Sequence, residues 1–138
     1  MTQFRSLLTA LAALIGPSPF CLARAAEQPP AQTFDANGVK ISYFVQGKGE
    51  PVVLLHGWLS SAGVNWALPG TSALLAKDYQ VIALDVRGHG LSDKPTKEDA
   101  YGPELVEDVV RLLDHLKIEK AHVVGYSMGG IIAANFLA

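Results

Sequence analysis

Residues 121–138 read AHVVGYSMGGIIAANFLA, and this stretch decides the fold. Residues 121–124 form an apolar run typical of a buried strand, and residues 131–138 have the composition of an apolar helix. Between them, Ser127 has a glycine two residues before it and another two residues after it. This spacing is typical of a sharp strand-to-helix turn that strains the serine backbone and exposes its hydroxyl oxygen. Ser127 is therefore a candidate nucleophile; a structural glycine-rich turn with an incidental serine is the alternative.

Two further apolar runs, Pro51–Leu55 and Val81–Leu84, precede this stretch and are typical of strands buried on both faces. Helical patterns separate the runs. Leu68–Lys77 is one, limited at its start by Pro69, and Glu104–Leu116 is another, with its leucines on one helix face. Buried strands that alternate with helices predict an α/β fold with a mostly parallel sheet and right-handed crossovers.

An antiparallel hairpin is predicted before the parallel strands. Asn37-Gly38 separates residues 33–36 from residues 40–46, and apolar and polar residues alternate in the second run. Asn-Gly between such runs is a strong hairpin signal. We expect residues 26–37 to form a linker and a first edge strand, because Pro29-Pro30 excludes a helix and a central strand.

Three glycine-bearing stretches follow the carboxyl ends of the three buried runs: HGW at 56–58, DVRGHG at 85–90 and GYSMG at 125–129. Ligands bind at this edge of open α/β sheets, so the three stretches outline one site. If Ser127 attacks a carbonyl carbon, two backbone N–H groups must stabilise the oxyanion. Met128, which follows the nucleophile, would supply one N–H group, and Trp58 is placed to supply the other.

The neighbouring residues of the first and third loops are predicted to support the site. Gly125 and Gly129 leave room for the sharp turn, and Gly57 belongs to the oxyanion loop. His56 precedes that loop and cannot easily face Ser127. We therefore expect His56 to orient the loop through hydrogen bonds.

The second loop is also predicted to be structural. We expect Asp85 and Arg87 to pair with each other and to pin the loop. This structural role is favoured over the alternative, a catalytic role, because a carboxylate beside a cation is a poor proton acceptor. We expect His89 to cap the same loop. His115 on the long helix and His122 within a strand are both expected to be structural.

Composition excludes several classes of protein. The 138 residues are 49% hydrophobic and 17% charged, which fits one domain with a buried core and not a disordered chain. Eleven Lys and Arg against thirteen Asp and Glu show no basic surface for nucleic acid. The His, Cys and Asp residues have no metal-ligand spacing, and no Gly-x-Gly-x-x-Gly follows a strand. We expect no metal and no cofactor.

Residues 1–25 are predicted to be a secretory signal peptide. Arg5 precedes the apolar run Leu7–Ile15, and Ala23-Arg24-Ala25 provides a small-x-small cleavage site. The apolar run is too short to span a membrane; an uncleaved amphipathic anchor is the alternative. Cleavage after Ala25 would remove Cys21 and export the protein to a periplasmic or extracellular location.

The motifs HGW, DVRGHGLSDKP and GYSMGG, in this order, resemble three sequence blocks of the α/β-hydrolase family. The resemblance runs from Gly38 to Ala138 and is to the esterase, C–C hydrolase and cofactor-free haloperoxidase type. It implies that Ser127 is the nucleophile and that Trp58 and Met128 form the oxyanion hole. In this family the sharp turn that carries the nucleophile is called the nucleophile elbow. A serine at the elbow argues against haloalkane dehalogenases and epoxide hydrolases, which have an aspartate there. The implied substrate is an ester or a similar apolar carbonyl compound.

The chain departs from the family pattern after the nucleophile. In the family, an Asp or Glu and then a His follow the serine, but the 11 residues after Ser127 contain none of these. We expect residues 38–138 to be the N-terminal part of the hydrolase domain and the chain alone to have little or no activity. There are four alternatives to a hydrolase fragment. The chain could be a truncated remnant, a small-ligand binding protein, an enzyme with perhydrolase or haloperoxidase chemistry, or a half-domain completed by a second chain.

Overall fold

The computed structural model describes residues 28–138. The predicted signal peptide at 1–25 and its cleavage site lie outside the described residues. No helix between Gln28 and Ala138 is both long enough and apolar enough to cross a membrane.

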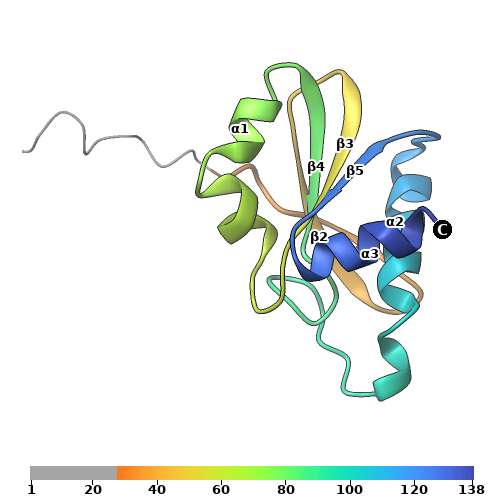
Figure 1. Ribbon diagram of the computed structural model, residues 1–138. Helices are drawn as coiled ribbons and strands as arrows, with labels where there is room; N and C mark the ends of the chain where they lie inside the picture. The colour runs from red at the N-terminus through yellow and green to blue at the C-terminus, as the bar shows by residue number, and fades with distance from the viewer. Residues whose placement is uncertain (1–27) are drawn as a thin grey trace, which may run out of the picture.

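A five-stranded mixed sheet forms the centre of the molecule (Figure 1). Its strands are β1 (Gln32–Asp35), β2 (Lys40–Gln46), β3 (Glu50–Leu55), β4 (Tyr79–Leu84) and β5 (His122–Gly125), in the spatial order β1-β2-β4-β3-β5. β3 pairs in parallel with both β4 and β5, while β2 pairs antiparallel with β1 and β4. This arrangement confirms the predicted parallel sheet with an antiparallel hairpin at its edge.

The hairpin turns at the predicted dipeptide. Asn37 and Gly38 have φ angles of 58° and 82°, so both adopt the left-handed conformation that a tight two-residue hairpin turn requires. Ala36 and Val39 exchange backbone hydrogen bonds around them, and the Asp35 carboxylate accepts the Gly38 N–H at 3.0 Å.

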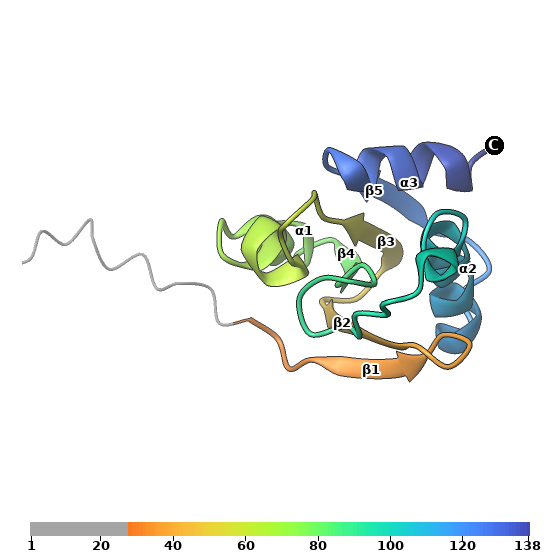
Figure 2. The same ribbon diagram turned by 90° about the horizontal axis from the view of Figure 1, so that it is seen from below.

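Helices cover both faces of the sheet (Figure 2). The short helix α1 (Thr71–Leu75), preceded by a wide π-type turn, η2 (Gly63–Ala67), lies on one face. On the other face lie α2 (Glu104–Leu116) and α3 (Met128–Phe136), with a 3-10 turn, η3 (Glu98–Ala100), before α2. The core accordingly has two halves, and alternate residues of β3 and β4 enter each.

The prediction that β3 and β4 are buried on both faces is confirmed. Val53, Leu55, Ile82 and Leu84 pack toward α2 and α3, while their neighbours in sequence pack on the other face. The apolar stripe of α2 also lies where its spacing predicts, with Val109 and Leu112 fully buried.

Three local predictions were wrong. The helix predicted over 68–77 covers only Thr71–Leu75, because Pro69 and the left-handed Gly70 separate it from the preceding turn. The last helix begins at Met128, not at 131, because the N–H groups of Gly130 and Ile131 bond to the Ser127 carbonyl. The run at 121–124 was expected to be a strand buried on both faces, but His122 and Val124 of β5 are exposed, because β5 is the outer strand of the sheet within residues 28–138.

Candidate active site

Ser127 lies in the tight turn between β5 and α3, at the carboxyl edge of the sheet. Its φ of 52° and ψ of −116° are values that L-residues rarely adopt, and its side chain is exposed. Both flanking glycines are needed for close approach. A Cβ at Gly125 would overlap the Gly129 carbonyl, and a Cβ at Gly129 would overlap the Leu55 carbonyl. The turn therefore has the strained geometry that exposes a nucleophile.

The loop after β3 packs directly against this turn. A Cβ placed on Gly57 would lie 3.4 Å from the Ser127 Cβ and 3.0 Å from the Tyr126 ring carbon Cδ1. The Tyr126 N–H donates to the Leu55 carbonyl at 3.0 Å, which ties the two strand ends together. The structure thus brings the first and third predicted loops into contact.

Two backbone N–H groups in these turns, one directly after Ser127 and one directly after Gly57, have no partner among the described residues. Met128 is the first residue of α3, where N–H groups have no partner within the helix. Among residues 28–138, neither the Met128 N–H nor the Trp58 N–H has a hydrogen-bond acceptor. Two unpaired donors next to an exposed hydroxyl can stabilise a developing oxyanion.

The indole ring of Trp58 extends from this loop toward solvent. It is 67% exposed and packs edge-on against the His89 ring, with 5.4 Å between ring centroids. The Nδ1 atom of His89 lies 3.2 Å from the Arg87 carbonyl oxygen. The Trp58 and His89 rings therefore lie together where the loop after β3 meets the second loop.

His56 holds the loop after β3 through hydrogen bonds at both of its ring nitrogens. It is fully buried; its Nε2 accepts the Val86 N–H at 3.0 Å, so Nδ1 carries the proton and donates to the Gly57 carbonyl at 2.8 Å. Burial lowers the pKa of the imidazole, although the hydrogen bond to Gly57 opposes this shift. Both ring nitrogens are occupied, so His56 has no lone pair for the serine proton.

The expected ion pair between Asp85 and Arg87 was wrong. The Asp85 carboxylate accepts the Ala62 N–H at 2.7 Å and the Leu91 N–H at 2.8 Å. A Cβ at Gly90 would overlap this carboxylate, which shows how tightly the loop wraps around it. Asp85 points into its own loop and the loop after β3, so it joins these two loops and leaves Arg87 to another partner.

Arg87 is paired with Asp108 of α2. Its Nε and Nη2 donate to the two carboxylate oxygens at 2.7 and 2.5 Å, and its Nη1 donates to the Ala100 carbonyl at 2.6 Å. The Arg87 and Asp108 side chains are each 2% exposed. Glu104 lies 3.5 Å from Arg87, and a hydrogen bond from Arg111 lowers the pKa of the Glu104 carboxyl.

The sequence analysis did not identify Asp108 as the partner of Arg87 or Asn65 as the partner of Gly57. A signal for Asp108 was available, because it lies on the buried stripe of α2 between Leu105 and Leu112, where a charge requires a partner. The Asn65 Oδ1 accepts the Gly57 N–H at 2.8 Å. No pattern in the sequence indicated this contact, because it depends on the path of the η2 turn.

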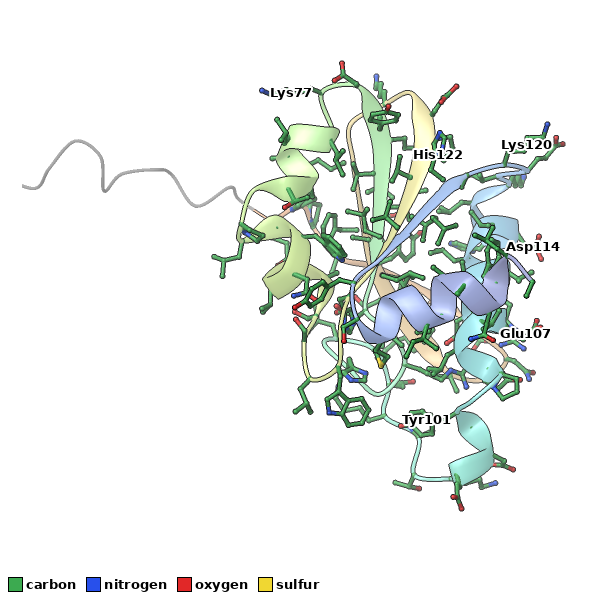
Figure 3. All side chains as sticks on the ribbon, viewed as in Figure 1. Lys77, Tyr101, Glu107, Asp114, Lys120 and His122 are labelled. Atoms are coloured by element: carbon green, nitrogen blue, oxygen red, sulfur yellow. The ribbon has the colours of Figure 1, made fainter. Side chains whose placement is uncertain are left out.

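The remaining histidines lie away from Ser127. His122 is at the amino end of β5, at the opposite end of the sheet from Tyr101, which packs beside the second loop at Gly88 (Figure 3). The His115 ring stacks on Phe34 with 5.3 Å between centroids. Within residues 28–138, no His, Asp or Glu is hydrogen-bonded to the Ser127 hydroxyl, and no cluster of three or more His, Cys, Asp or Glu could hold a metal ion.

Comparison with known proteins agrees with this geometry. Residues 50–138 match a family model described as the alpha/beta hydrolase fold. A soluble epoxide hydrolase from Corynebacterium sp. (strain C12) is 40% identical over 101 residues, which cover 72% of this chain and 34% of the relative. A dihydrolipoyllysine-residue acetyltransferase component of an acetoin cleaving system from Pseudomonas putida is 40% identical over 112 residues, covering 80% of this chain and 29% of the relative.

A crystal structure of an epoxide hydrolase from Vigna radiata superposes with a TM-score of 0.72 at 28% identity, covering 78% of this chain and 35% of that structure. These matches confirm the resemblance carried by the three motifs. The chain spans about a third of the length of the relatives that it matches.

Proposed function

The chain belongs to the α/β-hydrolase fold family, and on that premise we propose that it supplies the nucleophile and oxyanion hole of a serine hydrolase. The substrate would be an ester or a similar apolar carbonyl compound, and no cofactor would be required. One observation carries the proposal. The exposed, backbone-strained Ser127 lies against Gly57, and the residues that follow Ser127 and Gly57, Met128 and Trp58, have unpaired N–H groups within residues 28–138.

The reaction would proceed through an acyl-enzyme. The Ser127 Oγ bonds to the carbonyl carbon as its proton passes to a base, and the carbonyl electron pair moves onto oxygen. The Trp58 and Met128 N–H groups hold this oxyanion. The carbonyl then re-forms and expels the alcohol, which takes up the proton, and water cleaves the acyl–serine ester in the same way.

The serine proton needs an acceptor that residues 28–138 do not place beside it. His56 uses both ring nitrogens in hydrogen bonds, and Asp85 accepts two backbone N–H groups away from Ser127. We therefore propose that the base and its orienting acid lie outside these residues. The 138-residue chain alone would then turn over its substrate very slowly.

The names of several relatives raise epoxide hydrolysis as a second candidate. Chemistry disfavours it at this elbow. A carboxylate that opens an epoxide forms an ester, which water can hydrolyse, whereas attack by the Ser127 oxygen would form an ether, which water does not cleave under mild conditions. Turnover at Ser127 therefore calls for an acyl carbon.

Export and the binding partner are proposals of the same kind. The charged start, apolar run and small-x-small site within residues 1–25 support export to the periplasm or the exterior. We propose a small-molecule substrate as the partner. A catalytically inactive protein that binds a small apolar ligand is the alternative, and it is motivated by the lack of a base beside Ser127 within residues 28–138.

The test is hydrolysis of p-nitrophenyl butyrate by the protein as its natural gene encodes it, compared with a Ser127→Ala variant. Loss of the nucleophile should lower kcat by at least about a thousandfold. Thr33→Ala is the matched control; Thr33 is exposed on the edge strand β1, and loss of its hydroxyl should leave kcat unchanged. Equal turnover by the parent and Ser127→Ala would refute the serine mechanism, and no turnover by the parent would favour the binding role.

A further inference from the structure

A side chain of the η2 turn holds the proposed oxyanion loop, residues 56–58. Asn65 lies in the η2 turn and its Oδ1 accepts the Gly57 N–H at 2.8 Å. The donor is a backbone N–H, so the amide oxygen must face it. Gly57 in turn lies against the Tyr126 ring and Ser127. Asn65 thus connects the η2 turn to the point where the first loop meets the nucleophile.

Asn65 and His56 fix two successive peptide planes. Asn65 holds the peptide between His56 and Gly57 through its N–H, and His56 holds the peptide between Gly57 and Trp58 through its carbonyl. In a planar trans peptide, the N–H and C=O groups point in opposite directions. The Trp58 N–H therefore points away from His56, and its direction is set once both planes are held.

The turn that carries Asn65 is itself anchored. The Leu68 N–H donates to the Gly63 carbonyl at 2.8 Å, which closes the wide turn, and the Asn65 N–H donates to the Ser61 carbonyl at 3.0 Å. At its start, the Ala62 N–H donates to the buried Asp85 carboxylate at 2.7 Å. π-type turns occur frequently at functional sites, where they redirect a side chain. A continuous line of hydrogen bonds thus runs from the second loop to the oxyanion loop.

We propose that Asn65 is a positioning residue that sets the direction of the Trp58 N–H through Gly57. The inference rests on the proposed serine-hydrolase function and deepens it. An oxyanion donor must lie about 2.7–3.1 Å from the developing charge. A shift of a few tenths of an ångström in Gly57 would therefore weaken transition-state binding more than substrate binding.

The experiment measures kcat and KM for p-nitrophenyl butyrate in the protein as its gene encodes it, per active site titrated with a fluorophosphonate. Asn65→Ala removes the acceptor, and we expect kcat to fall about 10-fold with KM within about twofold, the effect of one lost hydrogen bond. The affinity for a phenylboronic acid, which forms a tetrahedral adduct with serine, should fall by a similar factor.

Two variants isolate the role of the acceptor. Asn65→Asp keeps an oxygen at the same reach, so kcat should return to within about threefold of the parent value. Asn135→Ala is the matched control; Asn135 is exposed on α3, and its Nδ2 donates only to the Ile131 carbonyl. Its kcat should equal that of the parent.

Three outcomes overturn the proposal: unchanged kcat per active site in Asn65→Ala, a rise in KM at constant kcat, or equal losses in Asn65→Ala and Asn65→Asp. A lower melting temperature with normal kcat per site would assign Asn65 a structural role only. If Ser127→Ala abolishes turnover while Asn65→Ala is normal, this inference alone fails. If turnover does not depend on Ser127, the proposed function fails with it.

Discussion

Three connections lie at the same edge of the sheet: the loop that follows β4 and the two turns that follow β3 and β5. They differ in whether their polar groups have hydrogen-bond partners. In the first, Asp85, Arg87 and Ser92 are buried, and each has at least two hydrogen bonds. In the two turns, the N–H groups of Trp58 and Met128 are unpaired within residues 28–138. The buried polar side chains of the loop after β4 are all paired, whereas the two turns carry the unpaired N–H groups that the proposed function assigns to the oxyanion.

The difference follows from the cost of burial. A buried charge without a partner destabilises the fold by several kcal/mol, so the Arg87 guanidinium and the Asp85 carboxylate must be fully paired. At the exposed Ser127 turn, water can satisfy the free groups. Substitutions of the buried, paired side chains should therefore change stability, and removal of the exposed Ser127 hydroxyl should change activity at little cost in stability.

The largest stability effect is expected at Arg87 and Asp108. Asp108→Ala leaves a buried guanidinium without its bidentate partner and should lower the free energy of unfolding by about 3–5 kcal/mol. Urea denaturation measures the change. The exposed pair of Lys40 and Asp93, with 3.9 Å between its charged atoms, provides the control, and Lys40→Met should cost less than about 1 kcal/mol. Similar losses in the two variants would contradict the distinction between buried, paired side chains and exposed ones.

A smaller effect is expected from two adjacent glycines of α3. A Cβ at Gly129 would overlap the Leu55 carbonyl of β3, whereas a Cβ at Gly130 would have only ordinary contact, at 3.5 Å from the Gly125 carbonyl oxygen. Gly129→Ala should cost about 3 kcal/mol of stability through overpacking, and Gly130→Ala should gain about 0.5–1 kcal/mol from helix propensity. Opposite shifts of the thermal midpoint would verify this packing of α3 on β3; shifts of the same sign would refute it.

The sequence predicted what depends on neighbouring residues. The apolar runs placed β3 and β4, because a strand buried on both faces needs a continuous apolar segment, and a third apolar run placed β5, which is covered on one face only. Asn37-Gly38 placed the hairpin because few other dipeptides adopt two successive left-handed conformations. The glycine spacing around Ser127 placed the elbow for the same kind of local, steric reason.

The sequence did not predict polar partners, because tertiary structure chooses them. Asp85 and Arg87 are close in sequence, but successive loop residues can point in different directions, and their partners are Ala62, Leu91 and Asp108. The Asn65 contact depends on the wide η2 turn, which no residue pattern predicted. A polar residue in a buried position indicates that it has a hydrogen-bond or ion-pair partner. The sequence does not identify which residue that partner is.

The smallest change in the free energy of unfolding is expected at Ser127, where it would come from backbone strain. A residue with φ of 52° and ψ of −116° carries about 1–3 kcal/mol of backbone strain unless it is glycine. Ser127→Gly should therefore raise the free energy of unfolding by about 1 kcal/mol, after the entropy that glycine adds to the unfolded chain is subtracted. Ser127→Ala removes the same hydroxyl but keeps the strain, so its stability should equal that of the parent. A difference between the two variants in urea denaturation isolates the backbone contribution. If the two variants are equally stable, the elbow stores no strain, and exposure of the hydroxyl is then a matter of turn geometry alone.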